Sequence, residues 1–309
     1  MITAAALATL ALVCAVGAWR FTRARWTYRA PHVAIVLWQA LGVTWGLAGT
    51  GALLSYALEP YGQGVLQGLG AFVVSAMNGG YGPAGSFTLP RILALIAGLT
   101  ALTILVVVLL TAGAQTLRAR RRHRTLLALV AREDPEVPGV RVVDHPGPAA
   151  YCVPGLRSEV VVSEGTLKLL SPAELTAVLA HEAAHVRERH DLVLLPFAAL
   201  HRALPWSRVV GRVQSEVGLL VEMAADDVAR RYCSPRRLAT ALLRFGTAGA
   251  APTPQGALGV SETAGSAVMA RVERLVSPGP DLPRQVRYAI VAFSVTLTAS
   301  APLLWLIPH

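Results

Sequence analysis

The stretch SPAELTAVLAHEAAHVRER, residues 171–189, contains the clearest helix start in this 309-residue chain. Ser171 is a typical N-cap residue, Pro172 suits the first helical position, and Glu174 completes a capping box. An apolar stripe follows at helical spacing and consists of Leu175, Val178, Leu179 and Val186. The pattern predicts a helix from Pro172 to about Arg189.

This helix carries two histidines, His181 and His185, which are four residues apart and therefore share one face. Two imidazoles placed in this way can bind one Zn²⁺, and the intervening Glu182 can act as general base toward water. The alternative is a histidine pair on a solvated helix face. The two alanines between the histidines count against that alternative, because they leave a flat surface on which a substrate could lie.

A catalytic zinc needs a third protein ligand and an open position. A second helical pattern, Val209 to Tyr232, supplies Glu222 as the best candidate. Asp226 lies one turn later and is expected to accept a hydrogen bond from a ligand histidine, which would fix its tautomer. Asp227 is the alternative to Asp226, and Asp191 is the alternative ligand. Without the histidine pair, this acidic cluster would be interpreted as a solvated face.

Other residues near these helices have weaker assignments. Tyr232 or Arg231 is a candidate to stabilise a tetrahedral oxyanion, and the spacing does not choose between them. His190 and Asp191 end the first helix and are expected to be caps or solvated. The stretch Gly246 to Gly265 is rich in small residues and proline, which predicts a loop that serves as a lid or a cleavable segment.

The motifs lie in a segment of about 170 residues, 114–286, which predicts an α+β domain. A basic helical pattern through Ala131 opens it, and short strands are expected at 140–143, 149–153 and 159–162, with a turn at Pro154-Gly155. The strand Glu159–Val162 is rich in β-branched residues. It is a candidate to pair with an extended substrate by edge addition.

The composition indicates a membrane protein. Hydrophobic residues make up 54% of the chain and charged residues only 15%, against about 25% in soluble domains. This excludes a disordered chain and argues against a purely soluble enzyme. Cys14, Cys152 and Cys233 are too few and too scattered for a disulfide framework or a cysteine-rich zinc site. Four uncharged stretches are long enough to span a bilayer: 2–19, 33–56, 92–113 and 289–307.

The arginines predict the orientation of these spans, because positive residues remain on the cytoplasmic side. Arginines follow the first and third spans and precede the fourth, whereas the loop 57–90 has no lysine or arginine. We therefore expect both termini outside and residues 114–286 in the cytoplasm. The loop 57–90 includes an apolar stretch, 64–77, that is typical of a re-entrant or interfacial segment. The Arg118–Arg124 cluster is interpreted as a topology anchor at the lipid bilayer, and nucleic-acid binding is not expected.

The first span is expected to be retained. No positive residue precedes its apolar stretch, and Arg20 and Arg23 follow it directly, both of which are wrong for a signal peptide.

The topology and the two motifs, in 171–191 and 220–230, resemble those of the BlaR/MecR-type membrane zinc metallopeptidases. The HtpX- and Ste-type membrane peptidases share the motif. The resemblance implies a gluzincin-like fold, Zn²⁺ as cofactor, His181, His185 and Glu222 as ligands, and Glu182 as base. It also implies cleavage of a protein substrate, such as a transcriptional repressor or the protein itself. β-Lactam-sensing members carry a penicillin-binding domain after the last span, and because this chain stops at His309, antibiotic sensing is not expected.

The prediction is therefore a mainly α membrane protein with three spans in 1–113, a cytoplasmic zinc endopeptidase domain at 114–286, and a fourth span at 289–307. Two alternatives remain. One is an HtpX-like quality-control protease of the membrane. The other is a non-catalytic receptor or scaffold that keeps the metal site. The sequence does not identify the substrate, the stimulus or the oligomeric state.

Overall fold

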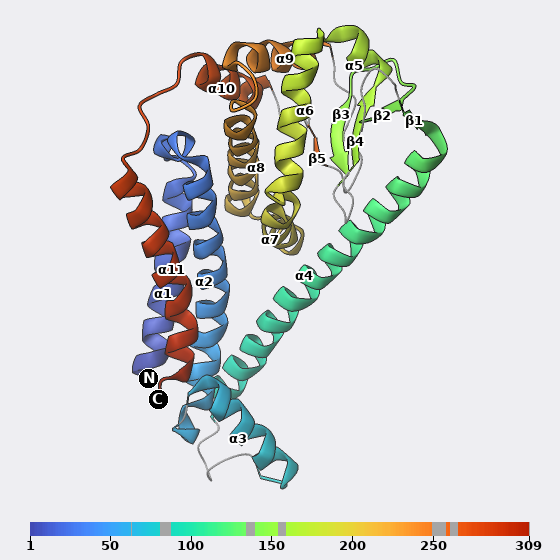
Figure 1. The fold of residues 1–309 in the computed structure, drawn as a ribbon. Coiled ribbons are helices and arrows are strands. Elements are labelled where there is room, and N and C mark those ends of the chain that lie inside the picture. The colour runs from blue at the N-terminus through green and yellow to red at the C-terminus, as the bar shows by residue number, and fades with distance from the viewer. Residues whose placement is uncertain are drawn as a thin grey trace.

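The computed structural model describes residues 1–62, 64–80, 88–133, 140–153, 159–248, 258–259 and 265–308. Its long helices form two arms that meet at one end and diverge toward a helical and sheet-containing part at the other end (Figure 1). One arm is a bundle of three helices and the second arm is a single long helix. The bundle consists of α1 (Ile2–Phe21), α2 (Pro31–Leu58) and α11 (Arg284–Leu306), and the single helix is α4 (Leu89–Val130).

All four of these helices are long and apolar enough to cross a membrane. Short 3₁₀ helices, Arg25–Arg29 and Glu59–Tyr61, flank α2, and the apolar helix α3 (Val65–Met77) lies where the arms meet. The helix that contains the third predicted span, 92–113, is longer than the span itself. It continues without a break into the basic segment, because no proline interrupts the chain between Arg91 and Val130. The predicted boundary at 113/114 therefore falls inside a helix.

Close approach of α11 to α2 depends on a glycine. A Cβ atom at Gly51 would lie 2.0 Å from Nε1 of Trp305. The indole Nε1 of Trp305 instead donates a hydrogen bond to the carbonyl oxygen of Leu47 at 3.2 Å. Small residues of this kind let helices approach closely where the hydrophobic effect between them is weak.

A sheet of five strands follows α4, in the spatial order β1-β2-β4-β3-β5. Its strands are β1 (Ala131–Glu133), β2 (Val140–Val143), β3 (Ala150–Val153), β4 (Glu159–Ser163) and β5 (Leu258–Gly259). The strands β2 and β4 pair in parallel, with Val140 opposite Val160, whereas the other pairs are antiparallel. The three predicted strands are present within one residue at each end. The expected turn at Pro154-Gly155 lies outside the described residues.

The proposal that the strand 159–162 pairs with a substrate at its edge is wrong. This strand is β4, which lies between β2 and β3 and is hydrogen-bonded on both sides. A β-branched sequence indicates a strand but does not specify its place in the sheet, and the three consecutive valines of β4 lie in the central strand.

Six helices complete this part of the chain: α5 (Glu164–Leu169), α6 (Pro172–Arg187), α7 (His190–Ala203), α8 (Arg208–Ala229), α9 (Pro235–Thr247) and α10 (Gly265–Val276). The capping box at the start of α6 is present. This helix ends two residues earlier than expected, because Arg189 adopts a left-handed conformation with φ 52° and starts α7. Most of the expected lid, 246–265, lies outside the described residues.

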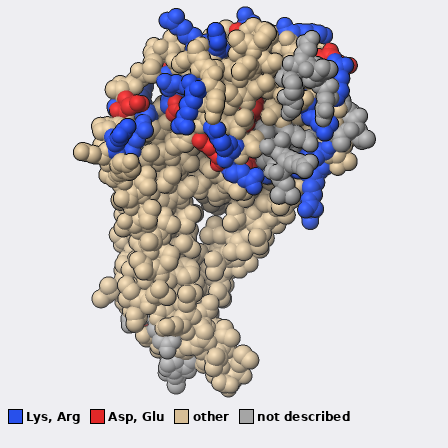
Figure 2. All heavy atoms as spheres, viewed as in Figure 1, with Lys and Arg blue, Asp and Glu red and all other residues tan. Residues whose placement is uncertain are grey.

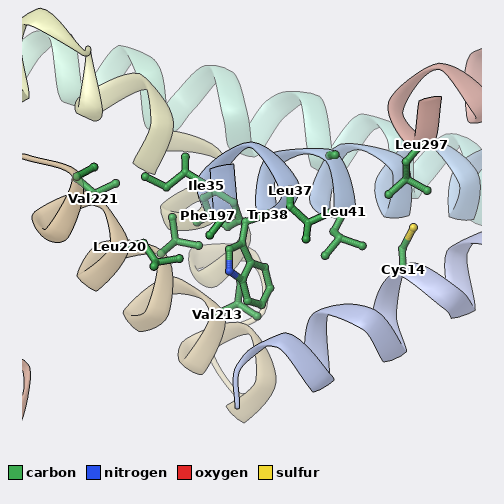
Figure 3. Packing of buried hydrophobic residues seen from close by; sticks show 14 residues of the cluster. Cys14, Ile35, Leu37, Trp38, Leu41, Phe197, Val213, Leu220, Val221 and Leu297 are labelled. Carbon is green, nitrogen blue, oxygen red and sulfur yellow. The ribbon is translucent and has the colours of Figure 1, made fainter. Parts of the chain in front are cut away.

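A hydrophobic cluster fixes α8 and α7 against α2 (Figure 3). Trp38 and Ile35 of α2 pack with Phe197 of α7 and with Leu220 and Val221 of α8. Each fully buried side chain of this size contributes about 1.5–3 kcal/mol. The last two residues directly precede Glu222, so the packing on α2, a candidate membrane span, sets the position of that carboxylate.

On the face shown in Figure 2, most charged side chains lie toward one end of the molecule. They cover the part that contains the sheet and the shorter helices, and the lower parts of the arms present uncharged atoms. This distribution agrees with arms that are embedded in a bilayer.

The capping box provides a test of local stability. Glu174 is buried and accepts hydrogen bonds from the backbone nitrogen and the hydroxyl of Ser171, both at 2.8 Å. Burial opposes its ionisation, but these bonds and the charge of Arg244 lower the pKa of Glu174 below its ordinary value of 4.5. We expect Glu174→Gln to lower the free energy of unfolding by about 1 kcal/mol near neutral pH.

The stabilisation depends on the ionised carboxylate, because the pKa is lower in the folded state. It is therefore complete above pH 4.5 and is lost as the pH falls through the folded value. Thermal unfolding of both proteins over pH 3–7 measures the difference, which should narrow in acid. Thr176→Ala, on the exposed face of the same turn, serves as control. A difference that is constant or that grows in acid would contradict this account of Glu174.

Candidate metal centre

Two adjacent helices, α6 and α8, bring the predicted residues together (Figure 1). His181 and His185 lie one turn apart on α6, and Glu222 and Asp226 lie one turn apart on α8. Each pair faces the other helix because the spacing of four residues places both members on one face. The ligand atoms of His181, His185 and Glu222 all lie within 4.8 Å of one another.

The distances between these atoms describe a compact cluster. The Nε2 atoms of His181 and His185 are 3.1 Å apart. The carboxylate of Glu222 lies 3.3 Å from Nε2 of His181 through one oxygen and 3.5 Å from Nε2 of His185 through the other. Both imidazoles therefore present the same ring nitrogen toward one carboxylate.

The cluster is buried but not closed. The side chains of His181 and His185 are each 1% exposed, whereas that of Glu222 is 19% exposed. The side of Glu222 is therefore the less buried side of the cluster. Such an arrangement suits a catalytic site, which keeps an open position, better than a closed structural site.

Burial and neighbouring charges shift the pKa values of the cluster. Burial opposes the charged form of His181, but the carboxylates of Asp226 and Glu222 raise the pKa of this histidine to about 9. Burial lowers the pKa of His185 to about 3, and the charges of His181, His190 and Arg271 add to this effect. Burial raises the pKa of Glu222, but His185, Arg271 and His181 outweigh it and lower the value to about 2. The carboxylate of Glu222 is thus ionised at neutral pH.

Glu182, the predicted base, is fully buried beside this cluster. It follows His181 directly on α6. Burial opposes the charge of Arg271, but Asp226, Glu222 and Glu182 raise the pKa of this guanidinium. The carboxylate of Glu182 is therefore close enough to the cluster to contribute to its electrostatics.

Asp226 lies behind His181, and Arg271, which the sequence analysis missed, contacts Asp226, Glu222 and, at 3.4 Å, Nε2 of His181. Asp226 Oδ1 lies 3.0 Å from Nδ1 of His181, on the opposite side of the ring from Glu222. Arg271 of α10 donates two hydrogen bonds to Asp226, at 2.9 and 2.8 Å, and its third nitrogen lies 2.9 Å from Glu222. The guanidinium thus holds both carboxylates of α8 in place. Arg271 follows the Gly246–Gly265 stretch, and no local motif distinguishes it from the other arginines.

Four other candidates lie outside the cluster. Tyr232 is exposed, and its hydroxyl accepts a hydrogen bond from Arg187, while Arg231 is also exposed. Asp227 pairs with Arg274 at 2.6 Å, and Asp191 pairs with Arg120 at 2.8 Å. The structure therefore does not bring Tyr232 or Arg231 to the metal ligands. The two alternative aspartates, Asp227 and Asp191, form ion pairs with arginines.

The prediction that His190 and Asp191 are caps or solvated is wrong. Both side chains are buried, and Nδ1 of His190 lies 2.9 Å from Nδ1 of His185. The cause is the tight reversal at Arg189, which turns the start of α7 back onto the end of α6.

The donor set fits a zinc ion. Two imidazole nitrogens and a carboxylate oxygen are the ligands that catalytic zinc sites use, and here they converge within 4.8 Å. The arrangement of Asp226 behind His181 also follows the usual pattern, in which a carboxylate orients a ligand histidine through its other nitrogen.

Comparisons with known proteins agree with this geometry. Residues 115–223 match the family model Peptidase family M48. "Protease HtpX homolog 2" of Methanosarcina mazei is 38% identical over 97 residues, which cover 30% of this chain and 33% of that protein. "Protease HtpX homolog" of Aeropyrum pernix is 38% identical over 79 residues, which cover 23% of this chain and 25% of that protein. No solved structure shows significant similarity.

The chain therefore matches a third or less of the length of these two relatives. The match to the M48 family includes His181, Glu182, His185 and Glu222 but ends before Asp226 and Arg271. The matches show that residues 115–223 are similar to M48 peptidases, and four helices of the described chain are long and apolar enough to cross a membrane.

Proposed function

We propose that this protein is a zinc-dependent endopeptidase, anchored in the membrane, that cleaves protein substrates at the cytoplasmic face. The observation that carries the proposal is the convergence of His181, His185 and Glu222 within 4.8 Å, with Glu182 buried beside them. In this proposal residues 114–286 form a gluzincin-like catalytic domain inserted between the third and fourth spans. The three converging residues hold the metal, and Glu182 is the base.

Each side chain of the site has a separate role in the proposed hydrolysis. A bound zinc ion would polarise the scissile carbonyl and lower the pKa of water. Glu182 accepts a proton from the attacking water and passes it to the leaving amine. Asp226 holds the ring of His181 through Nδ1, and Arg271 fixes Asp226 and Glu222 by its hydrogen bonds and charge.

The arginine distribution supports a cytoplasmic position of the catalytic part. An external thiol reagent that does not cross membranes tests this orientation in cells. In a chain without its native cysteines, we expect labelling of Asn78→Cys in intact cells and of Glu273→Cys only after permeabilisation. The reverse pattern would place the proposed site outside the cell and would contradict the cytoplasmic assignment.

The comparisons favour the HtpX-like alternative over a signalling role. Both relatives are named as HtpX homologues, and nothing in the matches points to a repressor as substrate. We propose that the substrates are membrane proteins with unfolded segments near the inner surface of the bilayer, because the catalytic helix α8 packs directly on the candidate span α2.

Proteolysis by the full chain in liposomes tests this function. We expect cleavage of an unfolded soluble protein, such as reduced casein, and of a single-span protein with an unstructured tail. A zinc chelator should stop the cleavage, and added Zn²⁺ should restore it. Stoichiometric zinc without cleavage of either substrate would instead support the non-catalytic scaffold. Cleavage that resists the chelator would exclude a metal-dependent reaction.

A further inference from the structure

His190 contacts the cluster from the side opposite to Glu222. Its side chain is 3% exposed, and its Nδ1 lies 2.9 Å from Nδ1 of His185. The other ring nitrogen, Nε2, lies 3.1 Å from a carboxylate oxygen of Glu188. The ring of His190 therefore lies between a proposed metal ligand and a carboxylate.

These contacts determine where the protons lie. The carboxylate of Glu188 only accepts hydrogen bonds. Nε2 of His190 is therefore protonated and donates a hydrogen bond to this carboxylate. Nδ1 of a neutral His190 is then an acceptor, and it requires a donor at Nδ1 of His185. With its proton on Nδ1, His185 has a free lone pair on Nε2, which is the nitrogen that faces Glu222.

The segment around His190 is anchored to both arms of the molecule. Glu188 also contacts Nε2 of His32 on α2, at 3.0 Å. Asp191 pairs with Arg120 on α4, at 2.8 Å. Between these two anchors the chain reverses at Arg189, with φ 52°. The position of the His190 ring is thus tied to two different candidate membrane spans.

We propose that His190, oriented by Glu188, is a positioning residue that holds the metal ligand His185 in the tautomer and ring orientation needed for coordination. Asp226 performs the corresponding task for His181, from the other side of the site. This inference rests on the metal-dependent function proposed above, but it concerns metal binding and not the cleavage step.

Metal affinity and the spectrum of bound Co²⁺ test the inference on the purified full chain in detergent. Loss of an outer partner of a ligand histidine typically weakens metal binding about 10–100-fold. We expect this loss for Zn²⁺ in His190→Leu, which removes the acceptor. His190→Asn keeps an acceptor oxygen near the position of Nδ1 and should recover most of the affinity. The visible bands of Co²⁺ should shift in the leucine variant and return in the asparagine variant.

His201→Leu on the same helix α7 is the matched control, since His201 has no contact with the cluster in the described part of the chain. Thermal unfolding without metal measures any general loss of stability. The inference is overturned if His190→Leu binds zinc as tightly as the wild type. It is also overturned if both His190 variants lose affinity equally, with unchanged Co²⁺ bands and an equal fall in unfolding temperature.

The outcomes separate this inference from the proposed function. Wild-type protein that binds zinc tightly, depends on His190 for it and cleaves nothing would support the positioning role and contradict the peptidase function. If the wild-type protein cleaves its substrates and His190→Leu binds zinc with unchanged affinity, the peptidase function is supported and the positioning role is contradicted. Wild-type protein that binds neither Zn²⁺ nor Co²⁺ would overturn both.

Discussion

Replacement of Glu182 by glutamine should lower peptide cleavage by about 10²–10⁴-fold, which is the usual contribution of a general acid–base group. Glutamine has nearly the same shape as glutamate, so the new side chain still fits the buried position on α6. It cannot accept the proton from water, however, and the reaction loses its base. Because Glu182 is not among the three converging ligands, the variant should bind as much zinc as the wild type.

The measurement is the initial rate of cleavage at saturating substrate, together with the metal content of the same sample. Glu273→Gln on α10 is a suitable control, because Glu273 is an exposed carboxylate outside the cluster. It should cleave at the wild-type rate. Full activity of Glu182→Gln would remove Glu182 from the mechanism, and loss of zinc together with activity would mean that Glu182 supports the metal and is not only the base.

Replacement of Glu222 by glutamine should weaken zinc binding by more than about 100-fold, since a lost ligand costs more than the loss of an outer hydrogen-bond partner. Glu222 is the only carboxylate among the three converging residues. Its charge also balances Arg271, which lies 2.9 Å away. The variant leaves a buried guanidinium with one carboxylate partner fewer, so a lower unfolding temperature should accompany the loss of metal.

Glu216→Gln provides the matched comparison on the same helix. Glu216 lies on α8 but contacts Tyr28, at 3.1 Å, and not the histidines. Competition with a chromophoric chelator should show wild-type zinc affinity for Glu216→Gln and a large loss for Glu222→Gln. Equal affinities of the two variants would show that α8 does not supply the third ligand.

The parts of the site that local spacing determines could be predicted from the sequence. The capping box at Ser171 and Glu174 gave the start of α6, and a spacing of four residues placed His181 and His185 on one face. The same spacing selected Glu222 and Asp226 on α8. Each of these inferences needs only the geometry of one helix, and the structure brings all four residues together.

The parts that depend on tertiary placement could not be predicted. Arg271 reaches Asp226 from α10, and the sequence separation says nothing about that contact. His190 looked like an exposed helix end, because the reversal at Arg189 has no signature in a single sequence. The place of β4 in the centre of the sheet is likewise a matter of strand order, which a pattern of β-branched residues does not contain.

The central claim is that side chains of α6 and α8 together hold one zinc ion. X-ray absorption of the zinc-loaded full chain tests it most directly, because the spectrum reports the ligand atoms themselves. The account predicts one zinc per chain with nitrogen and oxygen ligands at about 2.0–2.2 Å, including two imidazoles, and one imidazole fewer in His185→Ala. A spectrum with sulfur at about 2.3 Å, or one that is unchanged in His185→Ala, would contradict it.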